Sequence, residues 1–354
     1  MTSRERIKAV LEHREADRVP VQDSPWGATV SRWHREGLPE EIPVEEYFGY
    51  ELIQLGADLS ARFPIQILEK NENYILTTTP DGGKAKNFRD YSTTPEVVDT
   101  QVKTKEDWFN FKPRLQSDYK RIDWATTHNR YHQMRAGGKF ICFSAAVGYD
   151  RCQGFMNSER LLILMAEDPN TARDMFETVG KLAVDTCRML LKEGYEFDGA
   201  FFYNDMGYKN SSLFSPKMYR ELIFPIDKYI LGFCHENGMK TLLHSCGNVK
   251  PLVPFLIEAG LDCLEPLEVK AGMDLIELKK IYGNQLAFMG GIDVRKMVGA
   301  AADPTAIEEE IKTKFESAKK GGGYIYHSDH SVPKNVSFQD YQKVMELVGK
   351  YGNY

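Results

Sequence analysis

His244 and Cys246 are the side chains in this sequence best suited to chemistry, and they stand two residues apart in the apolar segment 240–247, KTLLHSCG. If this segment is a strand, both side chains point to the same face. Imidazole and thiolate donors together are typical of zinc sites. The spacing therefore predicts a pair of zinc ligands, with a buried cysteine beside a hydrogen-bonded histidine as the structural alternative.

A further ligand is expected from the segment 323–332, GYIYHSDHSV. On a strand His327 and Asp329 share one face and His330 lies on the other, so a bend at the strand end brings either Asp329 or His330 inward. Glu265, in LDCLEPLE, is a candidate for a fourth ligand, for orienting one of the histidines, or for pairing with a lysine. A polar surface loop is the alternative for HSDH.

Carboxylates at the ends of other apolar runs are candidates for catalysis. Asp205 follows FFYN and could act as a general acid or base, position the substrate or cap the next segment. Asp293 ends LAFMGGID and is a second catalytic candidate beside Glu265. In the same run Gly290 and Gly291 offer backbone N–H groups to an anion and are candidates for cofactor binding, although adjacent glycines are also typical of an ordinary turn.

Short apolar runs alternate with helical segments from residue 138 onward, and this alternation predicts parallel strands joined by crossover helices. The runs are nearly all apolar, as in strands that are buried on both faces. They are KFICFSAAVG, FDGAFFYND, KTLLHSCG, LDCLEPLE, LAFMGGID and GYIYHSDHSV. Together with one or two strands from the N-terminal part they favour a (β/α)8 TIM-type barrel over a doubly wound sheet. In such a barrel the site would lie at the carboxyl ends of the strands.

The N-terminal part is less regular, although we expect one domain over residues 1–354. Residues 1–137 are predicted to hold an opening helix, a first strand at DRVPV and a β-ribbon within residues 63–88; residues 138–354 form the regular repeats. No G-x-G-x-x-G or G-x-x-x-x-G-K-[ST] follows any apolar run, which disfavours a nucleotide-binding sheet.

Composition excludes several classes of protein. Among 354 residues, 45 Lys and Arg against 51 Asp and Glu give a net charge of −6, so nucleic acid is not an expected partner. No stretch approaches the roughly 18 apolar residues of a membrane span. The N-terminus lacks the apolar region of a signal peptide, which predicts a cytoplasmic protein whose six cysteines are free thiols or metal ligands.

Several segments in order resemble the uroporphyrinogen decarboxylase superfamily, which also contains zinc-dependent cobalamin methyltransferases. The resemblance covers most of the chain and implies a (β/α)8 barrel. The segments are SRERIKAVLEHREADRVPV, FYNDMGYKNSSLFSPKMYRELIFPIDKYI, LLHSCGNVKPLVPFLIEAGLDCLEPLE, LAFMGGIDVRKM and GGGYIYHSDHSVPKNVSFQDY.

The two branches of the superfamily differ near the first strand. True decarboxylases carry R-Q-A-G there, whose arginine binds substrate carboxylates; this chain reads VQDSPWGATVSRWHREG, with Arg32 and Arg35 nearby but outside the pattern. His244 and Cys246 match zinc ligands of the methyltransferases. Where the thiol-methylating enzymes carry a cysteine on the last strand, this chain offers Asp329 without a gap, or His330 with a one-residue deletion.

The resemblance therefore implies a zinc-dependent methyltransferase that moves a methyl group between a small O-, N- or S-methyl substrate and a corrinoid carried by a partner protein. The alternative is a decarboxylase acting on a carboxylated substrate in tetrapyrrole metabolism. A third possibility is a barrel without catalytic activity that binds a corrinoid or tetrapyrrole. A homodimer is also plausible for the family.

Overall fold

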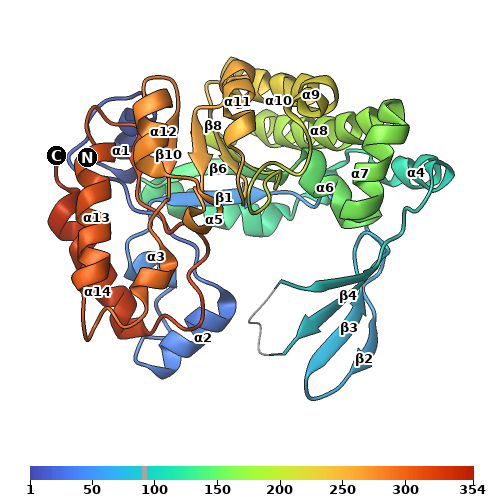
Figure 1. Cartoon of the computed structure of the whole chain (residues 1–354). Coiled ribbons are helices and arrows are strands. Elements are labelled where there is room, and N and C mark those ends of the chain that lie inside the picture. The colour runs from blue at the N-terminus through green and yellow to red at the C-terminus, as the bar shows by residue number, and fades with distance from the viewer. Residues whose placement is uncertain (90–93) are drawn as a thin grey trace.

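A seven-stranded parallel sheet forms the centre of the computed structural model, which describes residues 1–89 and 94–354 (Figure 1). All neighbouring strands pair in parallel and follow one another in chain order. The strands are β1 (Leu52–Gly56), β6 (Phe140–Ala146), β7 (Gly199–Tyr203), β8 (Lys240–His244), β9 (Cys263–Glu265), β10 (Ala287–Met289) and β11 (Tyr324–Ile325).

The segment DRVPV closes this sheet into a ring. Val21 forms a parallel bridge with Tyr326, just beyond β11, and the Tyr326 N–H donates to the Pro20 carbonyl at 2.9 Å. On the other side the Glu51 N–H donates to the Val21 carbonyl at 3.0 Å, next to β1. The predicted (β/α)8 barrel is confirmed. The segment DRVPV, predicted as the first strand, lies between β11 and β1 and completes the ring as its eighth member.

Apolar side chains fill the lower half of the barrel interior, which is the half toward the amino ends of the strands. Each strand contributes one or two of them, and where there are two they lie two positions apart, because alternate residues of a strand face the same side. Helix α1 (Ser3–Leu11) covers the amino ends of the strands and adds Ile7, Val10 and Leu11 to this core. The strand members are Leu52, Phe140, Cys142, Phe201, Leu242, Cys263, Ala287, Met289 and Ile325. Chemistry is therefore confined to the opposite end, the carboxyl end of the strands.

Helices cover the outside of the ring (Figure 1). The longest, α8, begins where Asp168 accepts a hydrogen bond from the Thr171 N–H and Pro169 occupies the first turn, where no N–H partner is needed. The outer helices are α5 (Trp124–Ala136), α6 (Gly148–Met156), α7 (Ser158–Glu167), α8 (Pro169–Lys192), α9 (Pro216–Met218), α10 (Phe224–Glu236), α11 (Val253–Ala259), α12 (Leu275–Tyr282), α13 (Thr305–Ala318) and α14 (Phe338–Gly352).

Two insertions follow the carboxyl ends of the first two barrel strands in the chain, the closing segment DRVPV and β1. Helices α2 (Gly27–Arg35) and α3 (Val44–Tyr47) come after the closing segment. A four-stranded antiparallel sheet then follows β1, where the sequence predicted a β-ribbon, and projects away from the barrel in Figure 1. Its strands are β2 (Ile67–Lys70), β3 (Tyr74–Thr78), β4 (Lys84–Phe88) and β5 (Glu96–Asp99), and α4 (Lys105–Phe111) leads back to the barrel.

Across residues 1–89 and 94–354, the helices are all too short or too polar to cross a lipid bilayer.

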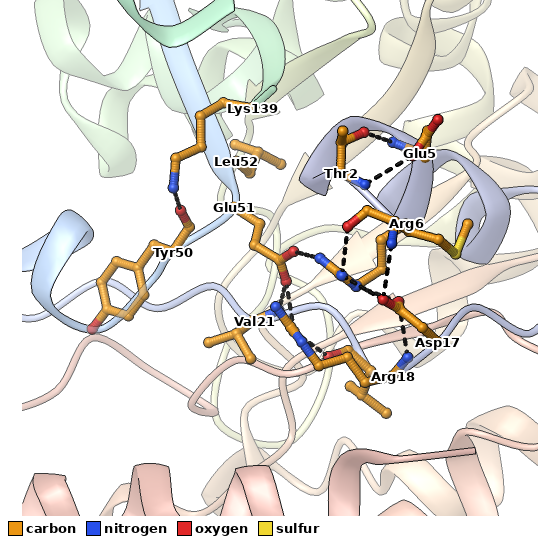
Figure 2. A network of polar contacts seen from close by, with 12 residues as sticks. Thr2, Glu5, Arg6, Asp17, Arg18, Val21, Tyr50, Glu51, Leu52 and Lys139 are labelled. Atoms are coloured by element: carbon orange, nitrogen blue, oxygen red, sulfur yellow. Dashed lines mark hydrogen bonds and ion pairs between the residues drawn. The ribbon is translucent and has the colours of Figure 1, made fainter. Parts of the chain in front are cut away.

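Buried charges join α1 to the point of ring closure (Figure 2). Glu51, with an exposed fraction of 1%, pairs with Arg6 and lies 3.0 Å from Arg18 Nη1. Its Oε2 also accepts the Val21 N–H at 2.6 Å. The Arg6 guanidinium reaches on to Asp17, 2.6 Å away. One carboxylate thus links the opening helix, the closing segment and β1.

We expect Glu51→Ala to lower the free energy of unfolding by about 3 kcal/mol or more, because it leaves the buried Arg6 guanidinium without one of its two carboxylate partners. Urea unfolding followed by circular dichroism measures the change. The control is Glu346→Ala, which removes the exposed pair of Glu346 with Lys343 and should cost under about 1 kcal/mol. Equal losses in the two variants would contradict the role given to Glu51.

A buried carboxyl in α10 makes stability depend on pH. Burial raises the pKa of Asp227 from 3.8 to about 7, although the Tyr219 hydroxyl donates a hydrogen bond to it at 2.8 Å. Between these two values the folded protein holds a proton that the unfolded chain releases. This group therefore makes stability fall as the pH rises through the window and adds no further change above it.

Asp227→Asn keeps the shape of the side chain and removes its titration. We expect the free energy of unfolding of the wild type, relative to the variant, to decrease between pH 4 and about 7 and then to level off. Urea unfolding of both proteins at half-unit pH intervals measures this difference. Parallel profiles over the whole range would show that Asp227 ionises normally.

Candidate metal centre

The inward side chains change from apolar to polar one step up six of the seven strands. The residue two positions beyond the apolar layer is polar. It faces the same side of the strand, because alternate residues of a strand share a face. The steps are Leu52 to Gln54, Cys142 to Ser144, Phe201 to Tyr203, Leu242 to His244, Cys263 to Glu265 and Ile325 to His327. The mouth of the barrel is therefore a polar ring above an apolar floor.

Three side chains converge at this level from neighbouring strands. The Nε2 atom of His244 lies 3.3 Å from Cys246 Sγ and 3.6 Å from Asp205 Oδ1. One donor atom from each of these residues lies within 4.8 Å of the other two, and all three residues are partly buried. Asp205 Oδ1 also accepts the Cys246 N–H at 2.8 Å, which fixes the loops after β7 and β8 to each other.

Glu265 orients the histidine from below. Its Oε2 lies 2.5 Å from His244 Nδ1, so the other ring nitrogen faces Cys246 and Asp205. Its Oε1 lies 3.6 Å from His327 Nδ1, and the carboxylate is 3% exposed. Burial alone raises the pKa of Glu265, but the His244 and His327 charges outweigh it, and the pKa is lowered.

The contact between Glu265 and His244 also determines the protonation of His244. Burial lowers the pKa of His244, but the Glu265 carboxylate and the hydrogen bonds to Cys246 and Glu265 outweigh burial, so the pKa is raised well above its ordinary value. Burial raises the pKa of Cys246 against the opposing effect of His244. A metal binding here would therefore displace protons from both side chains.

The donor set fits zinc. Nitrogen, sulfur and carboxylate donors in one partly buried cluster, with solvent on one side, are what catalytic zinc sites use, where three protein ligands leave one position open. A carboxylate on the distal nitrogen of a ligating histidine, as Glu265 is on His244, is also usual for such sites. Within the part of the chain that the structure describes, no other such cluster of at least three side chains is found.

A cavity of about 400 Å³ opens beside Cys246. It is formed by the loops that follow β7, β8 and β9 and is of a size that takes a small molecule. Its lining residues are Gly207, Tyr208, Lys209, Cys246, Gly247, Glu268, Lys270 and Ala271.

Residues 149–351, more than half of the chain and including the candidate metal centre and the cavity, match the family model described as uroporphyrinogen decarboxylase (URO-D). The chain belongs to the URO-D family. The family resemblance predicted from the sequence is thereby confirmed.

Two similar proteins come from Methanosarcina mazei. One is a methylated-thiol–coenzyme M methyltransferase, 27% identical over 88 residues, which are 24% of this chain and 21% of that protein. The match thus spans about a fifth of the relative's length. The other is a solved structure of a methyltransferase, with a TM-score of 0.69 and 14% identity over 99% of each chain. At this identity the likeness shows the shared fold.

The structure places Asp329 and His330, the predicted third ligands, outside the three-residue cluster. Asp329 accepts the N–H groups of Val269 and Val294 at 2.9 and 3.0 Å, so its carboxylate holds the loops after β9 and β10 together. The His330 ring stacks on Trp26 at 6.4 Å. Both stay predictions as ligands, and the geometry favours Asp205 in that place.

The remaining predicted residues are engaged in the framework of this URO-D barrel. Asp293 pairs with Arg295 at 2.6 Å. The N–H groups of Gly290 and Gly291 donate to the carbonyls of Ile325 and Pro266. A side chain at Gly290, whose φ is +114°, would meet the Pro266 carbonyl, so close approach of two backbones accounts for this glycine. Their catalytic and cofactor-binding roles stay predictions.

Two residues near the centre were not singled out from the sequence. Asp23 accepts hydrogen bonds from the hydroxyls of Ser328 at 2.6 Å and Tyr341 at 2.7 Å, and so joins β11 to the closing segment. Asp150, at the start of α6, has a pKa raised by burial and then by the charge of Asp205. The period of two points to the strand residues of the ring, but these two follow strands and have no motif of their own.

Asp205 is expected to hold zinc together with His244 and Cys246. Cys246→Ala and His244→Ala should remove nearly all bound zinc, and Asp205→Asn should weaken zinc binding by about tenfold or more. His330→Ala is the control and should keep the wild-type content. Elemental analysis after dialysis against graded chelator gives the zinc content, and circular dichroism checks the fold. Zinc lost in His330→Ala but kept in Asp205→Asn would reverse the assignment.

Proposed function

We propose that this protein is a zinc-dependent methyltransferase, which moves a methyl group between a small methylated substrate and a corrinoid on a partner protein. The observation that carries the proposal is the convergence of His244, Cys246 and Asp205 beside a small cavity at the barrel mouth. Membership of the URO-D family and similarity to proteins named methyltransferases support it.

Different residues of the site have different proposed roles. His244, Cys246 and Asp205 would hold zinc, which supplies a Lewis acid for the oxygen, nitrogen or sulfur that carries the methyl group. Glu265 keeps the proton of His244 on Nδ1 and aims Nε2 at the site. The Nδ1 atom of His327 lies 2.7 Å from the Ser328 carbonyl, and its Nε2 atom lies 3.1 Å from the Ser24 hydroxyl. His327 and Ser24 can therefore pass a proton to or from the mouth of the barrel.

The decarboxylase alternative has weaker support in the cavity. A tetrapyrrole with many carboxylates calls for bidentate arginines. The eight residues lining the cavity include two lysines and no arginine. Arg32 instead pairs with Glu36 at 2.6 Å and donates to the Lys334 carbonyl. The site is therefore better suited to a small substrate with few charges.

Methyl transfer can be measured with free cobalamin in place of the partner protein. Zinc-loaded protein is mixed with cob(I)alamin and a panel of O-, N- and S-methyl donors, and formation of methylcob(III)alamin is followed by its absorbance. We expect turnover with at least one donor class, loss to background in Cys246→Ala, and a decrease of about 10- to 100-fold in Glu265→Gln.

The same panel separates the two functions. Release of CO2 from a carboxylated substrate, unaffected by Cys246→Ala and without any methyl transfer, would replace the methyltransferase with a decarboxylase. Glu346→Ala, an exposed change on α14, serves as the control for general damage.

A further inference from the structure

A lysine and a histidine meet outside the barrel interior, at the amino end of the strands and away from the candidate metal centre. Lys279 lies in the last turn of α12, and His13 follows the end of α1. A Cβ atom at Gly323 would lie 2.8 Å from Lys279 Nζ and 2.9 Å from His13 Nδ1. The two nitrogen atoms therefore flank the same glycine, just before β11.

A turn of three glycines positions both groups. Residues 321–323 are all glycine, with φ between +71° and +73°, and the absence of Cβ atoms leaves room for the two nitrogens beside the turn. The Gly323 N–H donates to the Val10 carbonyl at 2.9 Å, which ties the turn to α1. Lys279 Nζ donates to the Gly322 carbonyl at 2.6 Å, which ties the turn to α12.

The Lys279 ammonium is partly buried without a carboxylate partner. Among the described residues no acidic side chain pairs with it, and its hydrogen bond goes to the Gly322 carbonyl. Burial lowers the pKa of Lys279 from 10.5 to about 8. At neutral pH a larger fraction of this lysine than of an ordinary one is therefore the neutral amine, which is the nucleophilic form.

His13 is placed to accept a proton from this amine. Its Nδ1 is buried and has no hydrogen-bond partner among the described residues. Burial, and then the charges of Lys279 and Lys240, lower the pKa of His13 against the opposing charge of Asp262. The imidazole is therefore neutral at pH 7 and able to act as a base.

We propose that Lys279 is an acylation site, at which a thioester supplies the acyl group and His13 serves as the base. The neutral Lys279 nitrogen attacks the thioester carbonyl, the C–N bond forms as the C–S bond breaks, and the sulfur leaves as a thiolate. His13 takes the proton that the nitrogen loses and passes it to the thiolate, so the products are an amide and a thiol.

The surroundings of Lys279 favour an amide as the product. An amide carries no charge, so its formation removes the cost of an unpaired ammonium in a partly buried place. It also keeps one N–H for the Gly322 carbonyl, whereas a neutral imine formed with an aldehyde keeps none. The site does not depend on methyl transfer, and either proposal can fail without the other.

Competition between two neighbouring lysines tests the site in the full-length protein. The probe is S-acetyl-N-acetylcysteamine, a small uncharged thioester. After the reaction the protein is unfolded, the remaining lysines are labelled with deuterated acetic anhydride, and tandem mass spectrometry gives the occupancy at each position. Lys280, which is adjacent and exposed, is the internal standard.

We expect acetylation of Lys279 at pH 7.5 to be at least about tenfold faster than that of Lys280, because more of the Lys279 amine is neutral. The rate at Lys279 should level off above about pH 8, whereas the rate at an ordinary lysine keeps rising. Equal rates at the two lysines across the pH range would overturn the proposal.

His13→Asn tests the base. Asparagine tolerates the φ of +54° at this position, and circular dichroism checks the fold. We expect the rate at Lys279 to fall at least about threefold and the rate at Lys280 to stay the same. His128→Asn, an exposed change on α5, is the matched control and should leave both rates unchanged. A Lys279 rate unaffected by His13→Asn would contradict the role proposed for His13.

Discussion

Glu51 binds the Val21 N–H through its carboxylate while its own N–H donates to the Val21 carbonyl, and these bonds complete the ring of strands. The geometry of the mouth depends on that closure. In a closed parallel ring, a shift of one residue would turn every inward side chain outward. Because the register holds, His244 stands opposite Tyr203 on one side and Glu265 on the other. The centre is thus a product of strand register.

A buried carboxylate between two histidines determines the electrostatics of the mouth. Glu265 is held ionised by His244 and His327, and in turn it favours the protonated form of His244. Such a group is costly to bury alone and is stable only with its partners. The arrangement keeps one nitrogen of His244 directed at Cys246 before any ligand arrives, which reduces the reorganisation that binding requires.

The sequence was informative wherever a local period carried the signal. The apolar runs predicted the strands, and the spacing of His244 and Cys246 predicted their shared face. Asp205 was predicted as a catalytic group, although its place beside these two depends on how β7 and β8 pair. Asp329 was predicted as a ligand, but the N–H groups that engage it come from two other loops. Lys209 and Lys270 belong to no motif, so only the fold brings them to one cavity.

On six of the seven strands an apolar inward residue is followed, two positions on, by a polar one, and this division has a consequence for evolution and engineering. Leu242 and Cys263 support the fold, whereas His244 and Glu265, one step above, face the mouth. Substitutions around the mouth that leave Glu265 with both of its histidine partners can therefore change selectivity while the lower ring keeps the chain folded. A library confined to the loops after β7, β8 and β9, with Glu265, His244 and His327 unchanged, would sample new substrates at little cost in the yield of folded protein.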